Sequence, residues 1–386
     1  MVKIGLLATL FGPYQGLGED GVRGAKLALE EHKAQNPESD IEFSIKSTDA
    51  TPLATISALE EAYKEGIRLF VGPLSGNEAL ALRQFARRHP ECTFVNGASG
   101  SQPVFSPAEN FFMFNATGAQ LMSGLGRYCY ETLGYRKIAT IGEAYSFPFA
   151  QIGGFAYDFV QSGGAIEKYS WCALGTQDYS TIIDEIPINV DAVYSSLGGT
   201  DGIHFIQQFQ EKRSDTPLIA GSIFGDQSLL TFVTEHAKAL TGVISASSHA
   251  DDLNTPEAIH FRELYRKAYP QDGFYTPSFF AVYYYINTKA LLLALQEVGT
   301  DETQLQEKLK HLRFKSPIGE IYLNHHRIAV IDTFINEIRQ NEDGHLYTHL
   351  IKRVEKTTNT LGMDDETYLN VGKFSKDTMP TSTTNM

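Results

Sequence analysis

Two short loops rich in glycine and serine are the first feature of this sequence that suggests chemistry. Residues 72–77 follow the apolar run Leu69–Val71, and residues 96–100 follow Thr93–Val95. Small residues where a helix or turn begins leave backbone N–H groups exposed, and hydroxyls add donors, so such loops bind a carboxylate without a cationic side chain. An ordinary strand–helix connection is the alternative for each loop alone. Two such loops after neighbouring strands favour a binding site.

Aromatic residues follow apolar runs further along the chain. Tyr145 and Phe147 come shortly after residues 137–141, and Phe224 follows Leu218–Ala220. Exposed rings at such positions are costly unless a ligand or a neighbouring lobe covers them. We therefore expect aromatic contacts to a ligand, with core packing as the alternative for Phe147.

A third glycine-rich segment, residues 16–21, matches the G-x-G-x-x-G pattern of dinucleotide-binding loops. Six residues separate it from the preceding apolar run, however, and the acidic residue Asp49 lies 33 positions after Gly16. That motif needs its first glycine directly after a strand and an acidic residue about 20 positions later. A glycine-rich loop lining a cleft is the expected use.

No enzymatic or metal-binding motif is present. Ser99 lacks the glycine two positions later that a G-x-S-x-G nucleophile elbow requires, because residue 101 is serine. His325 and His326 are adjacent in a polar segment, where we expect a solvated turn in preference to a metal site. The sequence therefore predicts no catalytic residues, no metal and no cofactor.

The net charge and the hydropathy of the chain each argue against a further class of protein. The chain of 386 residues has 32 basic and 46 acidic side chains, a net charge of −14, which disfavours nucleic acid as a partner. No apolar stretch is long enough to span a membrane, since Asn287 and Lys289 interrupt the best candidate. We expect a soluble globular protein.

The cysteines and the N-terminus bear on the cellular compartment. Cys92, Cys129 and Cys172 are too few for a disulfide scaffold, and we expect buried free thiols. Residues 1–9 suggest a first strand and no signal peptide. Either the protein is cytoplasmic, or a leader has been removed.

Short apolar runs alternate with stretches of helical period twice along the chain. This alternation predicts an α/β protein with two Rossmann-like, doubly wound parallel sheets. Two strands joined by residues 324–327 are expected near the end, followed by a polar tail that is extended or disordered.

Several segments resemble those of ABC-importer solute-binding proteins in the branched-chain amino acid group. They occur in that family's order from residue 2 to about residue 355, and together they are specific although each is weak alone. The segments are 4–7 (IGLL) with Gly12-Pro13, 18–25 (GEDGVRGA), 70–75 (FVGPLS), 133–139 (LGYRKIA) and 314–319 (FKSPIG).

The resemblance implies the type I periplasmic binding protein fold, with two lobes joined by three crossovers. The implied ranges are 1–119 and 250–328 for lobe 1, 120–249 and 329–355 for lobe 2, and 356–386 for the polar tail. The implied crossings lie near 118–121, 248–252 and 326–330. Movement at such hinges would close the lobes around a ligand.

In lobe 1, the resemblance assigns the glycine- and serine-rich loops to ligand binding. Ser75 and Gly76, together with Ala98, Ser99 and Gly100, match the family's carboxylate-binding loops. This agrees with the chemistry that the residues suggest by themselves.

In lobe 2, Phe147 matches a position where many members of the family carry an aromatic lid residue, usually tyrosine. Residues from Tyr194 to Gly198 match another loop that faces the ligand. With Tyr145 and Phe224, these residues complete the expected binding set.

One departure from the family concerns the ligand class. Members that bind amino acids place an acidic side chain for the ligand's ammonium group where this chain has residues 221–224, and Ile223 and Phe224 cannot supply that charge. Asp226 lies close by and keeps the alternative open. An aromatic or apolar acid is favoured over a branched-chain amino acid.

The implied function is a non-catalytic, extracytoplasmic solute-binding subunit. Its partners would be a small carboxylate and the permease and ATPase subunits of an importer, and we expect a monomer in the periplasm. A cytoplasmic ligand-sensing regulator of the same fold, as in the amide sensors, is the alternative.

Overall fold

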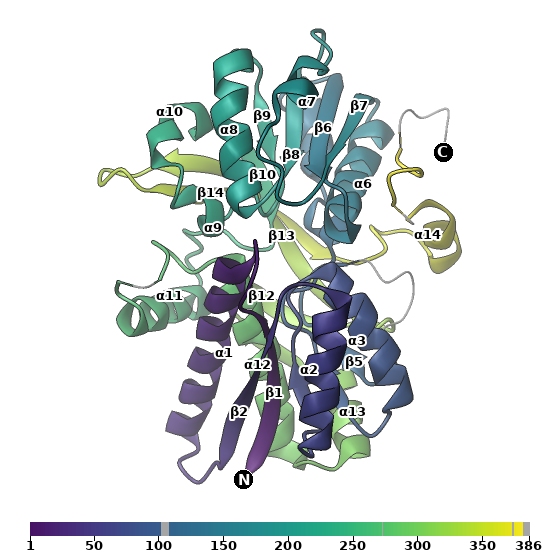
Figure 1. The fold of residues 1–386 in the computed structure, drawn as a ribbon, viewed down its shortest axis with the longest axis vertical. Coiled ribbons are helices and arrows are strands. Elements are labelled where there is room, and N and C mark those ends of the chain that lie inside the picture. Colours follow the sequence, from purple (N-terminus) through teal and green to yellow (C-terminus); the bar gives the residue numbers. More distant parts are fainter. Residues whose placement is uncertain (102–107, 272, 373, 381–386) are drawn as a thin grey trace. The chain divides into compact units, whose positions relative to one another are not determined.

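The computed structural model describes residues 1–101, 108–271, 273–372 and 374–380, and the chain forms two compact units. Unit 1 comprises Met1–Ala116 and Asn254–Ile331, and unit 2 comprises Thr117–Leu253 and Asp332–Met386. The chain therefore passes from one unit to the other after Ala116, Leu253 and Ile331. Figure 1 allows these passages to be followed by colour.

Unit 1 is built on a parallel sheet with the strand order β2-β1-β3-β4-β5. The strands are β1 (Val2–Thr9), β2 (Ile41–Thr48), β3 (Leu69–Val71), β4 (Thr93–Val95) and β5 (Phe111–Phe112). Strands β3 and β4 are buried at every position, as their unbroken apolar sequences predict for a sheet covered on both faces. Val71 pairs with Val95, so both strands end at the same level.

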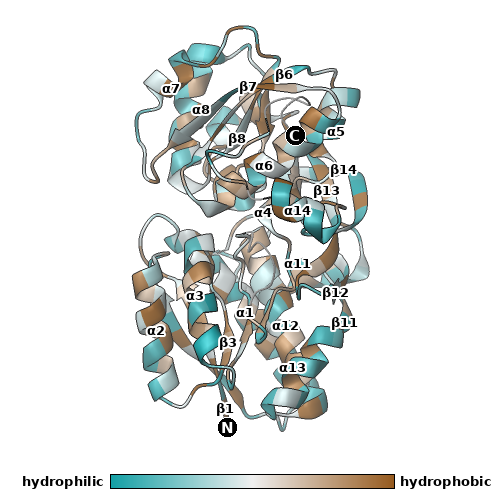
Figure 2. Ribbon diagram, turned by 90° about the vertical axis from the view of Figure 1, so that its right-hand side faces the viewer, coloured by the Kyte–Doolittle hydropathy of each residue, from teal (hydrophilic) through white to brown (hydrophobic). Residues whose placement is uncertain are grey.

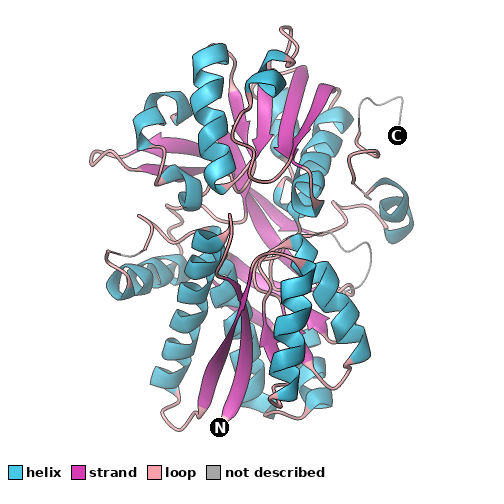
Figure 3. Ribbon diagram, in the orientation of Figure 1, coloured by secondary structure: helices cyan, strands magenta, loops and turns pink. Residues whose placement is uncertain are grey.

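Helices flank the strands of unit 1 (Figure 3). They are α1 (Gln15–Gln35), α2 (Pro52–Lys64), α3 (Gly76–Arg88), α11 (Pro256–Ala268), α12 (Phe279–Val298) and α13 (Glu302–His311). In Figure 2, α2 and α3 carry both apolar and polar residues, as expected for helices with one buried face. The strands β11 (Arg313–Ser316) and β12 (Gly319–Leu323) form an antiparallel pair.

Unit 2 contains the strand order β13-β10-β9-β8-β6-β7, with β14 pairing with β13. The strands are β6 (Lys137–Glu143), β7 (Ala165–Cys172), β8 (Ala192–Ser196), β9 (Leu218–Ala220), β10 (Ile244–Ser247), β13 (Ala329–Gln340) and β14 (Leu346–Thr357). Strands β6 to β10 pair in parallel, whereas β13 is antiparallel to β10. The α/β architecture that the sequence predicts is confirmed in both units.

The helices of unit 2 are shorter on average. They are α4 (Gly118–Leu121), α5 (Leu125–Glu131), α6 (Ser146–Gln161), α7 (Ser180–Asp184), α8 (Gly199–Arg213), α9 (Gln227–Leu230), the 3-10 helix η1 (Thr234–His236), α10 (Ala237–Leu240) and α14 (Asp365–Val371). Residues 227–240 form three short helical pieces, α9, η1 and α10. Strand β14 was not predicted, and it extends the sheet beyond β13.

The C-terminal segment differs from the extended tail that its polar composition predicts. Asp364 caps α14 by accepting a hydrogen bond from the backbone N–H of Thr367, and Tyr368 is completely buried. The hydroxyl of Tyr169 in β7 also donates to the carbonyl of Pro380. A few apolar and aromatic anchors therefore order a segment whose average composition is polar; residues 381–386 lie outside the described residues.

The structure also shows the state of the three cysteines and the character of the longest apolar helix. All three cysteines are free and buried, as predicted, and burial raises the pKa of the Cys92 and Cys172 thiols to about 12. Among the described helices, none combines the length and apolar character needed to cross a membrane. Helix α12, the best candidate by sequence, is mostly buried within unit 1.

The burial of Tyr368 in α14 can be tested with Tyr368→Ala. Removing a fully buried aromatic ring should lower the free energy of unfolding of unit 2 by about 3 kcal/mol. Denaturant unfolding followed by the fluorescence of Trp171, the one tryptophan of the chain, reports on this unit. The control is Leu369→Ala, whose side chain is 38% exposed, and an equal loss in both variants would contradict the packing described.

Candidate functional site

The two glycine- and serine-rich loops of unit 1 are bonded directly to each other. The backbone N–H groups of Ala98 and Ser99 both donate to the carbonyl oxygen of Pro73, over 3.0 and 3.3 Å. Because β3 and β4 are adjacent and parallel, their carboxyl ends meet at one edge of the sheet. The structure therefore joins the loop after β3 to the loop after β4 through Pro73.

Three fully buried asparagines hold the second loop from inside the unit. The side-chain amides of Asn96 and Asn115 both donate to the carbonyl of Ser99, over 2.7 and 3.0 Å. The amide of Asn287 in α12 donates to the carbonyl of Gly97 over 3.0 Å and to Asn115 Oδ1 over 3.2 Å. Every carbonyl engaged in this way points towards the asparagine cluster.

This arrangement fixes where the N–H groups of the loop point. In a trans peptide the carbonyl and the following N–H point in opposite directions. The Gly97 carbonyl accepts from Asn287, and the N–H of Ala98 accordingly points away, to Pro73. The Ser99 carbonyl is held in the same manner, so the N–H of Gly100 points away from the asparagines, and no described residue accepts a hydrogen bond from it.

Ser75 has a different role from the one expected. Its hydroxyl donates to the carbonyl of Ala50 and also accepts from the N–H of Glu78, while its own N–H donates to Glu78 Oε2. Ser75 is therefore the N-cap of α3, within a complete capping box. The donors that remain at this helix end are the first-turn N–H groups of Gly76 and Asn77, which donate to no described residue.

The carboxyl group of Glu78 lies beneath this helix end. Burial raises its pKa, although hydrogen bonds from Thr48, Ser75 and Thr9 act in the opposite direction. Glu78 thus completes the capping box of α3 from a buried position.

In unit 2, two buried side chains connect the ends of the parallel strands. Gln151 of α6 donates to the hydroxyl of Ser222, after β9, and accepts from that of Ser196, at the end of β8, over 2.8 Å. Glu143, the last residue of β6, accepts from the N–H of Gly198 over 3.0 Å. Gly198 thus lies at the carboxyl edge of the sheet, at the N-cap of α8, but its N–H is already used.

Two aromatic residues predicted to contact a ligand belong to the core of unit 2. Phe224 is completely buried and meets Phe205 edge to face, with ring centroids 6.3 Å apart. Tyr194 is also completely buried and stacks on Phe155 with centroids 4.4 Å apart. A position near a strand end does not by itself determine which way a side chain points, and here both rings point into the core.

Tyr145 and Phe147 remain at the start of α6. Tyr145 is the N-cap residue and is half-buried. Phe147 is 6% exposed, and its ring packs against Gly118, where a Cβ atom would lie 3.3 Å from Cδ2. The aromatic part of the candidate site in unit 2 is therefore limited to these two residues.

Asp226, the alternative partner for a ligand's ammonium group, caps a helix. Its Oδ1 accepts from the backbone N–H of Ser228 over 3.0 Å, and the residue is 6% exposed. This bond already uses the carboxylate at the start of α9.

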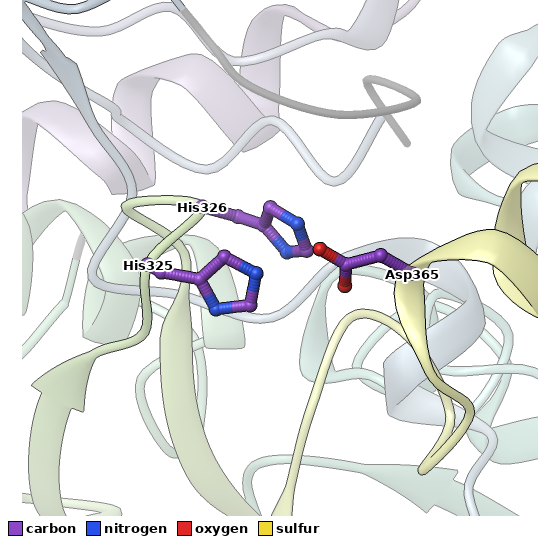
Figure 4. Close-up of side chains that lie close together, drawn as sticks. All are labelled: His325, His326 and Asp365. Atoms are coloured by element: carbon purple, nitrogen blue, oxygen red, sulfur yellow. The ribbon is translucent and has the colours of Figure 1, made fainter.

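The two remaining motifs are explained by structure. Gly16, Gly18 and Gly21 lie inside α1, not in a loop, and a Cβ atom on Gly18 would come within 1.8 Å of the Thr9 carbonyl. His325 and His326 stand on the turn between β12 and β13, with ring centroids 3.9 Å apart (Figure 4). His325 is exposed, as a solvated turn predicts, whereas His326 is buried.

Asp365, also labelled in Figure 4, begins α14 in unit 2. A zinc site needs at least three protein ligands. The two histidines of unit 1 supply one ligand atom each, so this pair by itself does not form a zinc site.

Comparison with known families agrees with this fold. A family model described as periplasmic binding protein matches residues 1–343. The chain belongs to this family. Its members are binding proteins, so the loops above belong to a binding protein and not to an enzyme. No curated protein sequence matches the chain.

Solved structures similar to this periplasmic binding protein include several transport proteins. An ABC transporter substrate-binding protein from Sphaerobacter thermophilus is 25% identical, with a TM-score of 0.84 over 93% of this chain and 99% of that chain. A solute-binding protein of an ABC transporter from Rhodopseudomonas palustris, in complex with 3,4-dihydroxybenzoic acid, is 22% identical, with a TM-score of 0.85 over 93% and 98%. A leucine-binding protein from Thermotoga maritima is 18% identical, with a TM-score of 0.79 over 92% and 99%.

The asparagine cluster of the binding protein can be tested with Asn287→Leu. Leucine leaves the Gly97 carbonyl and the Phe114 N–H without their partner and removes one of the two hydrogen bonds that Asn115 Oδ1 accepts, so unfolding should become easier by about 3 kcal/mol. The control is Thr288→Val at the next, equally buried position, because the hydroxyl of Thr288 has no hydrogen-bond partner among the described residues.

Chemical denaturation of both variants measures the difference. We expect Thr288→Val to be neutral or stabilising. Equal stability of Asn287→Leu and the wild type would show that the asparagines do not hold the loop.

Proposed function

We propose that this periplasmic binding protein is the solute-binding component of an ABC importer and binds a small carboxylate. Family membership and the likeness to the Sphaerobacter thermophilus protein support the transport role. Such a protein works outside the cytoplasmic membrane and delivers its ligand to permease and ATPase subunits. It performs no chemistry on the ligand.

The observation that carries the proposal is the set of unused donors in unit 1. The N–H groups of Gly76, Asn77 and Gly100 donate to no described residue, and α3, a helix of 13 residues, directs the positive end of its dipole to the same edge. The hydroxyl of Ser99, 3.4 Å from that of Ser101, adds a fourth donor. Together they suit the two oxygens of a carboxylate.

The global charge makes local donors necessary. A net charge of −14 repels an anion at long range, although salt screens this repulsion beyond about 8–10 Å. Short hydrogen bonds from fixed N–H groups are screened far less. Binding therefore depends on loop geometry more than on the overall field.

An aromatic acid without an ammonium group is the favoured ligand class. The loop of residues 221–224 contains no acidic side chain, and the nearest one along the chain, Asp226, caps α9 through Oδ1. Tyr145 and Phe147 supply aromatic surface at the start of α6, whereas Tyr194 and Phe224 no longer support this choice. Structural neighbours bind 3,4-dihydroxybenzoic acid and benzoate, although others bind isoleucine or leucine.

A thermal unfolding screen tests the ligand class. Benzoate, 4-hydroxybenzoate, leucine, isoleucine and benzamide would be added to the full chain at equal concentration. A ligand at about 100 times its Kd adds about 2.7 kcal/mol to the free energy of unfolding and should raise Tm by several degrees. We expect the aromatic acids to stabilise the protein and the amino acids to have little effect.

Benzamide is the matched control, because it keeps the ring and removes the charge. Equal stabilisation by benzoate and benzamide would contradict carboxylate recognition, and stabilisation by leucine alone would contradict the ligand class. Ser99→Ala should weaken benzoate binding about tenfold by removing one hydrogen bond to a charged group.

A further inference from the structure

Glu143 connects two of the loops at the carboxyl edge of unit 2. It is the last residue of β6 and is completely buried. Its Oε1 accepts the N–H of Gly198 over 3.0 Å, whereas Oε2 has no hydrogen-bond partner among the described residues. Gly198, the N-cap residue of α8, is therefore held by a carboxyl group of which one oxygen accepts a hydrogen bond and the other has no partner among the described residues.

The groups that face Glu143 provide no positive charge. They are Asp201 in the first turn of α8, Cys172 at the end of β7 and Tyr179 before α7. Asp201 is itself buried and accepts the N–H of Gly175 over 2.8 Å. Burial, with a smaller contribution from Asp201, raises the pKa of Glu143 to about 8 and outweighs the hydrogen bond from Gly198, which lowers that pKa.

We propose that Glu143 is a positioning residue that sets an alkaline limit on ligand binding: its neutral carboxyl group holds the loop at Gly198, and its ionisation loosens that loop. This inference rests on the proposed function and on the sequence-based expectation that the loop ending at Gly198 faces the ligand. It adds a dependence of ligand affinity on pH to the proposed function.

Thermodynamic linkage gives the direction of the effect. In the ordered loop the carboxyl is buried beside Asp201 without a counter-charge, whereas in a loosened loop water solvates it and its pKa returns towards 4.5. The ordered loop therefore holds the proton more tightly. As the pH rises between these two values, the ordered loop loses stability relative to the loosened one, and ligand affinity falls with it.

The experiment measures the affinity of the full chain for benzoate at about pH 6 and at about pH 9, by calorimetry. Benzoate is ionised throughout this range, so a change reports on the protein. We expect wild-type affinity to fall at least about fivefold, and the affinity of Glu143→Gln, which cannot ionise, to change less than about twofold. Glu131→Gln, an exposed carboxyl of the same unit, should follow the wild type.

Glu143→Ala distinguishes positioning from bulk packing. It removes the acceptor of the Gly198 N–H, so binding should be weak at both pH values, and glutamine should restore it. Identical pH profiles of the wild type and Glu143→Gln would overturn the proposal.

Two readouts do not depend on any ligand. The free energy of unfolding of the wild type should fall relative to that of Glu143→Gln as the pH rises from about 5 to about 8, because the proton is held more tightly in the folded state. Carbon NMR of wild-type glutamate carboxyls should show one group that titrates above pH 7, and the absence of such a group would overturn the proposal even if the variants did not fold. Failure of benzoate to bind at either pH would count against the proposed ligand class, while these two readouts would still decide the role of Glu143.

Discussion

The carbonyl oxygen of Pro73 accepts two backbone hydrogen bonds, from Ala98 and from Ser99, and the candidate carboxylate site of unit 1 depends on this contact. It joins the loop after β3 to the loop after β4. The asparagine cluster holds the same loop from the other side through the carbonyls of Gly97 and Ser99. Donors fixed in this way cost little entropy when a ligand binds, because the loop is already ordered.

The two units use buried polar groups for the same purpose but with different chemistry. In unit 1 the connecting groups are neutral amides, which keep the same charge at any physiological pH. In unit 2 the strand ends are connected by Gln151 and by Glu143, and Glu143 can ionise. The asparagine cluster should therefore be insensitive to pH, whereas the contact made by Glu143 should be sensitive to it.

The sequence predicts the architecture and the loops of unit 1 because both depend on local patterns. Alternating apolar runs indicate the strands, and glycine with serine indicates the loops. The asparagine cluster is harder to predict, because Asn287 meets Asn115 across 172 positions of the chain. Its one local signal is a polar residue within the apolar run of α12. The burial of Phe224 and Tyr194 is equally hard to predict, because the direction of a side chain near a strand end depends on packing with distant helices.

The central claim is that backbone N–H groups of unit 1 bind the carboxylate, and amide NMR of isotope-labelled protein tests it most directly. Addition of benzoate should shift the amide proton resonances of Gly76, Asn77 and Gly100 downfield, as new hydrogen bonds to an anion do, and benzamide should not. Saturating benzoate that shifts other resonances and leaves these three unchanged would contradict the claim.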